Sequence, residues 1–155
     1  MQNTLKQLVR IAPFTTFFLI ASIHLINARL DPDIHHDGII YAAAVASSQG
    51  LLPNRDYFTQ YGPVTSIMQG IWLYFTEPTL YSLRIFNVAI LLISSYLVYK
   101  IIKTSINFSL ALLILLALNI STPTILPYLV AWPSVISTMI LLLVLLILQI
   151  GRAHV

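Results

Sequence analysis

Long apolar segments without charge constrain this chain more than any other feature. A helix needs roughly 20 mostly apolar residues to cross the hydrocarbon core of a bilayer. Charged residues make up 8% of the chain, against about 25% in soluble domains. The sequence therefore predicts an all-α integral membrane protein. The charge-free intervals lie between Arg10 and Arg29, and over residues 57–76, 85–99 and 104–151.

About five transmembrane helices are predicted, with a juxtamembrane helix in the first loop, residues 31–63. Asp33 can cap the start of this short helix and Gly50 can end it, so that it lies at the membrane surface. In the first span, His24 is expected to pack against another helix. Residues 1–10 form a cytoplasmic lead-in. The expected spans are Ile11–Leu30, Pro63–Phe75, Leu83–Ile102, Ile106–Ile120 and Pro133–Ile150.

The positions of Lys and Arg predict which side of the membrane each loop occupies. Two basic residues precede the first span, so the positive-inside rule places the amino terminus inside and residues 31–63 outside. Alternation through five spans then places Arg84 inside as a cytoplasmic anchor, with Lys100 and Lys103 outside. That last pair conflicts with the rule. Either the first span dominates, which is the interpretation adopted, or the second expected span does not cross.

Four of the five acidic residues fall in the polar loop, and a histidine pair accompanies them. A chain this poor in charge has little reason to gather carboxylates at one membrane face unless something is bound or reacted there. Asp37, in the first turn of the short helix, could accept a proton as a general base. The alternative is that Asp37 caps the helix or stays solvated. The loop carboxylates are Asp31, Asp33, Asp37 and Asp56.

The loop resembles the first non-cytoplasmic loop of the GT-C glycosyltransferases, polytopic enzymes that use lipid-phosphate-linked sugars. Its motifs are Asp31-Pro-Asp-Ile-His-His-Asp-Gly38 and Arg55-Asp-Tyr-Phe-Thr-Gln-Tyr-Gly-Pro63. Enzymes of the protein mannosyltransferase and aminoarabinose transferase kind carry an Asp-Glu pair at the helix start, often with a Tyr four residues after the Asp. Asp37 and Tyr41 match those positions, and Gly38 stands where the Glu would be. The resemblance covers residues 10–102.

The resemblance implies that Asp37 is the catalytic base and that the loop residues around it bind substrate. In the family, the zone before the second span helps to hold the lipid phosphate or the sugar. Arg55 is the natural phosphate partner, because guanidinium binds such groups with paired hydrogen bonds. The alternative is that Arg55 pairs with Asp56 or with lipid headgroups. The expected substrate-binding residues are His36, Tyr41, Arg55, Asp56, Gln60 and Tyr61.

No metal site is assigned. His35 and His36 next to Asp37 suggest ligands, but neighbouring residues on a helix point about 100° apart, so both imidazoles cannot easily face one ion. Some GT-C enzymes use a divalent cation bound by acidic loop residues, so a divalent cation stays open and no other cofactor is expected. The absence of cysteine excludes disulfides and thiolate ligands. The small net charge of +3 gives no sign of nucleic-acid binding.

The function implied is that of a membrane glycosyltransferase in the bacterial inner or plasma membrane, with its catalytic loop extracytoplasmic. It would pass a sugar from a polyprenyl-phosphate donor to a lipid, glycan or protein acceptor, among membrane lipids. A transporter or flippase-like protein that binds a cation or a lipid headgroup without glycosyl transfer is the chief alternative. A noncatalytic scaffold is a further one.

Residues 11–150 are interpreted as the N-terminal part of a GT-C-like transmembrane domain. Residues 150–155 match what a common sequencing adapter encodes in one reading frame. We therefore expect an N-terminal fragment that is inactive by itself.

Overall fold

The computed structural model describes residues 2–30, 33–125 and 132–152, with side chains for residues 11–30, 33–121 and 132–151. The described residues form six α-helices and no strand, which confirms the all-α prediction. Most of residues 150–155, the expected adapter-derived ending, lie outside the described side chains. The helices are α1 (Gln2–Asn27), α2 (Ile34–Ser48), α3 (Pro63–Phe75), α4 (Leu80–Ile102), α5 (Phe108–Ile125) and α6 (Pro133–Arg152).

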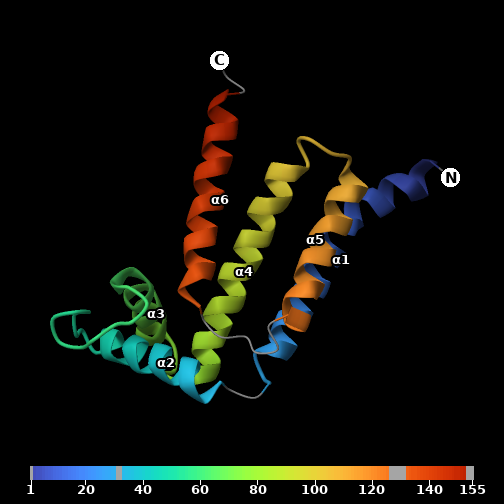
Figure 1. The fold of residues 1–155 in the computed structure, drawn as a ribbon. Helices are drawn as coiled ribbons and strands as arrows, with labels where there is room; N and C mark the ends of the chain where they lie inside the picture. Colours follow the sequence, from blue (N-terminus) through green and yellow to red (C-terminus); the bar gives the residue numbers. More distant parts are fainter. Residues whose placement is uncertain (1, 31–32, 126–131, 153–155) are drawn as a thin grey trace.

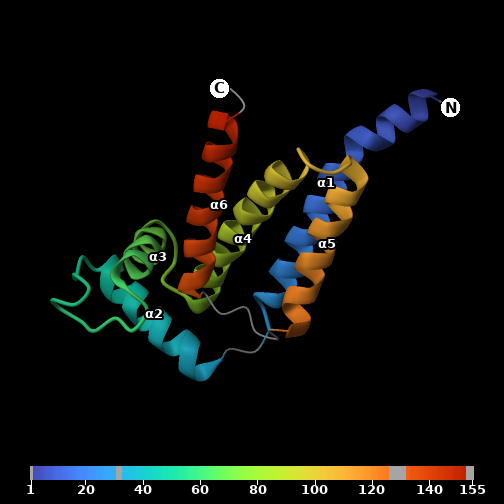
Figure 2. The same ribbon diagram turned by 45° about the horizontal axis from the view of Figure 1, so that its top comes forward.

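Four helices build a bundle, and the other two form a hairpin at one end of it (Figures 1 and 2). In the bundle, α1 packs on α4 and α5, and α4 packs on α5 and α6. The hairpin consists of α2 and α3, which pack against each other and against the first turns of α4. The amino terminus, the α4–α5 turn and the end of α6 lie at the opposite end of the bundle (Figure 1).

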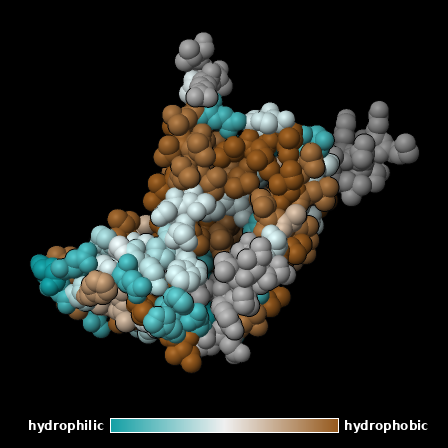
Figure 3. Space-filling view, in the orientation of Figure 1, coloured by the Kyte–Doolittle hydropathy of each residue, from teal (hydrophilic) through white to brown (hydrophobic). Residues whose placement is uncertain are grey.

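Two of the described helices are long and apolar enough to cross a membrane. They are α4 and the Pro133–Gly151 part of α6. The described apolar parts of α1 and α5 are shorter, at Ile11–Asn27 and Phe108–Ser121. Hydrophobic residues cover the bundle in a broad band, and hydrophilic residues gather over the hairpin end (Figure 3). The five predicted spans are therefore matched in part.

The hairpin helices begin and end for local reasons. Asp33 accepts hydrogen bonds from the backbone N–H groups of His35 and His36, so it caps α2 as predicted. At the other end of α2, Gly50 has a φ of 82°, a left-handed conformation that glycine adopts without strain. Proline at the first position of α3 lacks an N–H group that would have no helical partner there.

The structure places α3 differently from the predicted second span, although its bounds, Pro63–Phe75, are as predicted. Thirteen residues give a helix about 20 Å long, which is shorter than the roughly 30 Å hydrocarbon core. Because α3 folds back along α2, the start of α4 lies beside the start of α2. Arg84 of α4 contacts Asp37 of α2 directly, with 2.5 Å between Nη2 and Oδ2. The prediction that these residues lie on opposite sides of a membrane is therefore wrong.

Close contact between α2 and α3 depends on Gly70. A Cβ atom at this position would lie 2.9 Å from the backbone nitrogen of Ser48 and would also collide with the side chain of Ser47. Any larger residue would push the two helices apart. Tyr57 adds to the contact, because its hydroxyl group bonds to Ser47 at 2.5 Å and to Ser66 at 3.1 Å.

Candidate functional site

Asp37 and Arg84 form a buried ion pair where α1, α2 and α4 meet. Their exposed fractions are 1% and 2%. Besides bonding to Asp37, Arg84 donates through Nη1 to the carbonyl oxygens of Leu30 at 2.6 Å and Ala28 at 3.3 Å, just beyond the end of α1. Carbonyl groups at a helix end lack helical partners and carry partial negative charge. Arg84 therefore joins three segments of the chain, a role that the prediction of a cytoplasmic anchor did not include.

The two oxygens of Asp37 differ in their surroundings. Oδ2 accepts from Arg84 and from the backbone N–H group of Asp33 at 3.0 Å. Oδ1 is buried and has no hydrogen-bond partner among the described residues. These bonds fix the orientation of the carboxylate and leave one oxygen able to accept a proton. Because the side chain is almost fully buried, a substrate must enter the junction to reach that oxygen.

His36 is held beside this junction by the capping residue. Its Nδ1 lies 2.8 Å from Oδ2 of Asp33. The backbone N–H group of His36 and then its side chain, both bonded to Asp33, lower the pKa of that carboxyl group. The described residues contain no cluster of three or more His, Cys, Asp or Glu side chains that could hold a metal ion. The site therefore offers a paired carboxylate and imidazole, with no assigned metal ligands.

Trp132, which the sequence did not single out, packs its ring against two of the predicted site residues, one tilted and one edge to face. Its ring centroid lies 4.7 Å from that of His36 and 5.6 Å from that of Tyr61. The start of α6 is thereby brought against α2 and the α2–α3 loop. A tryptophan before Pro133 is a signal for a helix start near a membrane boundary. Nothing in the linear pattern indicates its contact with residues so far away in the chain.

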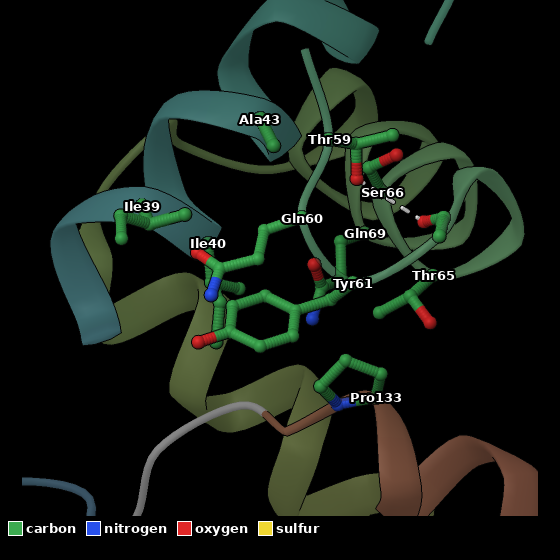
Figure 4. A pocket seen from close by; sticks show the side chains of 11 residues that line it. Ile39, Ile40, Ala43, Thr59, Gln60, Tyr61, Thr65, Ser66, Gln69 and Pro133 are labelled. Atoms are coloured by element: carbon green, nitrogen blue, oxygen red, sulfur yellow. Dashed lines mark hydrogen bonds between the residues drawn. The ribbon is translucent and has the colours of Figure 1, made fainter. Parts of the chain in front are cut away.

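Gln60 and Tyr61 line a small pocket between α2, α3 and the start of α6 (Figure 4). Gln60, Gln69 and Tyr61 point toward the same space, with Pro133 below them (Figure 4). The lining of the pocket is mostly apolar, and its volume of about 10 Å³ has room for about one water molecule. The amide and hydroxyl groups in the lining are neutral and both donate and accept hydrogen bonds. Its lining residues are Ile39, Ile40, Ala43, Thr59, Gln60, Tyr61, Gly62, Thr65, Ser66, Gln69 and Pro133.

Arg55 and Asp56 lie apart from Asp37. They follow α2, whereas Asp37 lies in its first turn, and the loop projects from the far end of the helix (Figure 1). Arg55 donates to both carboxylate oxygens of Asp56, at 2.9 and 2.8 Å. These bonds raise the pKa of Arg55 and lower that of Asp56, which also accepts from the backbone N–H group of Leu52. The pair folds its own loop, which is the alternative that the sequence left open.

Tyr41 donates a hydrogen bond to the carbonyl oxygen of Pro78, in the turn between α3 and α4. This contact ties α2 to the start of α4. It gives Tyr41 a role in holding the hairpin, and Tyr41 is not among the residues that line the Gln60–Tyr61 pocket.

A second polar group lies inside the bundle. His24 of α1 is 1% exposed, and its Nε2 lies 2.9 Å from Oδ1 of Asn119 on α5. Ser95 of α4 donates to the same oxygen at 3.1 Å. Three helices therefore share one hydrogen-bonded cluster in apolar surroundings. The prediction that His24 packs against another helix is confirmed.

Comparison of the chain with protein families, with curated proteins and with solved structures gives no match. The evidence for the function of this protein therefore comes from the arrangement of its site residues. Of the predicted residues, His36 and Asp37 share the start of α2, and Gln60 and Tyr61 approach it from the loop. Arg55, Asp56 and Tyr41 have partners of their own.

Proposed function

We propose that this chain is part of a GT-C-like membrane glycosyltransferase that takes a sugar from a polyprenyl-phosphate donor. The acceptor would be an extracytoplasmic lipid, glycan or protein. The observation that carries the proposal is the buried carboxylate of Asp37, oriented by Arg84 at the hairpin end of an apolar bundle. The resemblance of the loop to GT-C enzymes supports the same conclusion.

The proposed arrangement has α1, α4, α5 and α6 crossing a bacterial inner or plasma membrane, with the α2–α3 hairpin outside. The contact between Asp37 and Arg84 supports an arrangement with the start of α4 on the hairpin side of the membrane. The other end of α4, with Lys100 and Lys103, then lies on the same side as the basic amino terminus. All these cations face the cytoplasm, as the positive-inside rule expects. The conflict that a crossing α3 would create disappears.

In the proposed reaction, Oδ1 of Asp37 takes the proton of the acceptor hydroxyl or amine as that group attacks the sugar. Arg84 is a positioning residue, because it holds Oδ2 and so directs Oδ1. Gln60 and Tyr61 would orient the sugar. The departing phosphate needs positive charge near it. Arg55, which the resemblance assigns to this role, lies beyond the other end of α2 and is bonded to Asp56. A divalent cation stays open as an alternative partner of the phosphate.

The proposal is tested by Asp37→Asn in the complete reading frame that contains this chain. Membranes would be given a polyprenyl-phosphate sugar, and transfer to endogenous acceptors would be measured. Loss of a general base lowers the rate by about 10²–10⁴-fold. Asp33→Asn is the matched control, because Asn also caps helices and should preserve most of the rate. Normal turnover by a correctly inserted Asp37→Asn protein would contradict the assignment.

A loss of rate must be separated from a loss of folding, because Asp37 also belongs to a buried ion pair. Asp37→Glu keeps the charge and displaces the reacting oxygen. A variant that retains the native unfolding midpoint and loses transfer supports a catalytic role. Equal losses of folding and transfer in both variants would indicate a structural role alone.

A transporter or flippase-like protein is the second candidate, and the buried His24 cluster favours it. Ionisable residues inside membrane bundles commonly mark transport pathways. In this case substrate would move without a new covalent product. His24→Ala would abolish the flux. The native protein would show no glycosyl transfer, so Asp37→Asn would have no such activity to remove. A noncatalytic scaffold would tolerate both changes.

A further inference from the structure

The hairpin helix α3 has two distinct sides. The side that it turns to the protein carries the polar residues Thr65, Ser66 and Gln69, which are buried together with Gly70 and Leu73. The opposite side carries large apolar residues at helical spacing, and these form one face. We refer to this set as the outer face of α3. Its members are Val64, Ile67, Ile71, Tyr74 and Phe75, with exposed fractions of 58, 39, 55, 70 and 78%.

The outer face lacks any charge that would favour contact with water. The sequence has no Asp, Glu, Lys or Arg between Asp56 and Glu77. Soluble monomers rarely expose large contiguous apolar patches, and those that exist mark contact with another molecule or a membrane. The outer face therefore needs an apolar partner.

The depth of α3 follows from its contacts with α4. The indole Nε1 of Trp72 donates to the backbone oxygen of Ser82 at 2.9 Å, and Thr76 bonds to the hydroxyl of the same serine at 2.7 Å. Ser82 lies in the first turn of α4, whose 23 residues span about 34 Å. This is slightly more than the roughly 30 Å core, so the first turn of α4 lies at the membrane boundary. α3 lies alongside that turn.

A buried apolar cluster joins α3 to the bundle. Met68 and Trp72 of α3 pack in it with Phe86 and Ile90 of α4 and Ile136 of α6. Further along α6, large apolar side chains are exposed, among them Ile140, Leu141 and Val144. The outer face therefore belongs to a helix that packs on α4 and α6, the two helices long and apolar enough to cross a membrane, and lipid is the occupant that fits both.

We propose that α3 lies in the plane of the bilayer, with its outer face inserted among the acyl chains of the adjacent leaflet. Helices with one strongly apolar face bind membranes in this way, at the boundary of headgroups and chains. The side of α3 that carries Thr65, Ser66 and Gln69 then faces the protein. This position of α3 does not rest on the proposed function.

The test uses spin labels on the chain in phosphatidylethanolamine–phosphatidylglycerol vesicles. Since the chain contains no cysteine, single labels can be placed by Ile67→Cys and Ile71→Cys. Ser105→Cys, in the exposed turn between α4 and α5, is the control for water, and Leu141→Cys, near the middle of α6, is the control for lipid. Collision rates with oxygen, which concentrates in lipid, and with a water-soluble nickel chelate give the surroundings and depth of each label.

We expect both α3 labels to have an oxygen-to-nickel collision ratio several-fold above that of Ser105→Cys, and a shallower depth than Leu141→Cys. A ratio equal to that of Ser105→Cys would place the outer face in water and overturn the proposal. Low collision with both reagents would show that a second copy or another protein segment covers it, which also overturns it. A depth equal to that of Leu141→Cys would restore a crossing α3. Absence of sugar transfer would leave the result unchanged.

Discussion

Two arginine–aspartate pairs in this molecule have similar contact distances and very different surroundings. Arg84 and Asp37 lie 47 positions apart in the sequence, and their side chains are 3% and 2% exposed. Arg55 and Asp56 are neighbours in a loop, with exposed fractions of 69% and 24%. The first pair joins three segments of the chain. The second closes one turn.

The comparison shows that the contribution of an ion pair to stability depends on its burial and on how many segments of the chain it joins. The distance between the two charged groups does not distinguish the pairs. Exposed pairs contribute little, because water and salt screen them and ordering two side chains costs entropy. A buried pair must recover the cost of removing two charges from water. Hydrogen bonds offset this cost here. Arg84 donates to the carbonyl oxygens of Ala28 and Leu30, and Asp37 accepts from the backbone N–H group of Asp33.

Arg84→Met should give the largest loss of stability. Breaking a buried pair leaves a charge without its partner and costs about 3–5 kcal/mol. The free energy of unfolding can be measured by titrating sodium dodecyl sulfate into protein in neutral detergent micelles. The double variant Arg84→Met/Asp37→Leu is the control, because it removes both charges and should recover much of the loss. Equal instability of single and double variants would remove the distinction between the two pairs.

Tyr57→Phe should have an intermediate effect. It removes the hydroxyl that connects Ser47 and Ser66 across the hairpin and fixes the loop that holds the exposed pair. A hydrogen bond of this kind contributes about 0.5–1.5 kcal/mol. Tyr74→Phe is the matched control, because that ring is 70% exposed. The same titration measures both, and equal behaviour of the two variants would show that the loop is held by other contacts.

Asp33→Asn should have a smaller effect that depends on pH. Bonds from His36 lower the pKa of Asp33 below its ordinary value of 3.8. Its ionised form therefore stabilises the native state above that value, and the contribution is lost as the pH falls through the lowered pKa. The difference in unfolding free energy between native protein and variant should be constant near neutral pH and shrink below pH 3.8. A difference that grows on acidification would contradict the assignment.

Arg55→Gln should have the smallest effect. The guanidinium is largely exposed and contacts a carboxylate that is also held by the backbone of Leu52. We expect no measurable change in the unfolding titration at physiological salt. A loss comparable to that of Arg84→Met would show that the loop pair supports the fold as strongly as the buried one. A loss of sugar transfer with unchanged stability would instead support a phosphate-binding role for Arg55.

The sequence by itself determined the helices and much of the local chemistry. Asp33 caps α2, Gly50 ends it, and proline begins α3 and α6, as predicted. These features depend on neighbouring residues, whose caps and backbone preferences act within one or two turns. For the same reason, His36 and Asp37 could be placed together at the start of α2. Length and the absence of charge were sufficient to select α4 and α6 as helices able to cross a membrane.

The tertiary structure decided which of these local pieces meet. Neither the partner of Arg84 nor the contacts of Trp132 with His36 and Tyr61 follow from any spacing in the chain. The sequence does not decide the role of α3, for a physical reason. A short uncharged helix has the same composition whether it crosses a bilayer or lies against it, and helical periodicity defines its two faces without showing which one turns to the protein. Close packing on α2 at Gly70 shows which side of α3 turns to the protein.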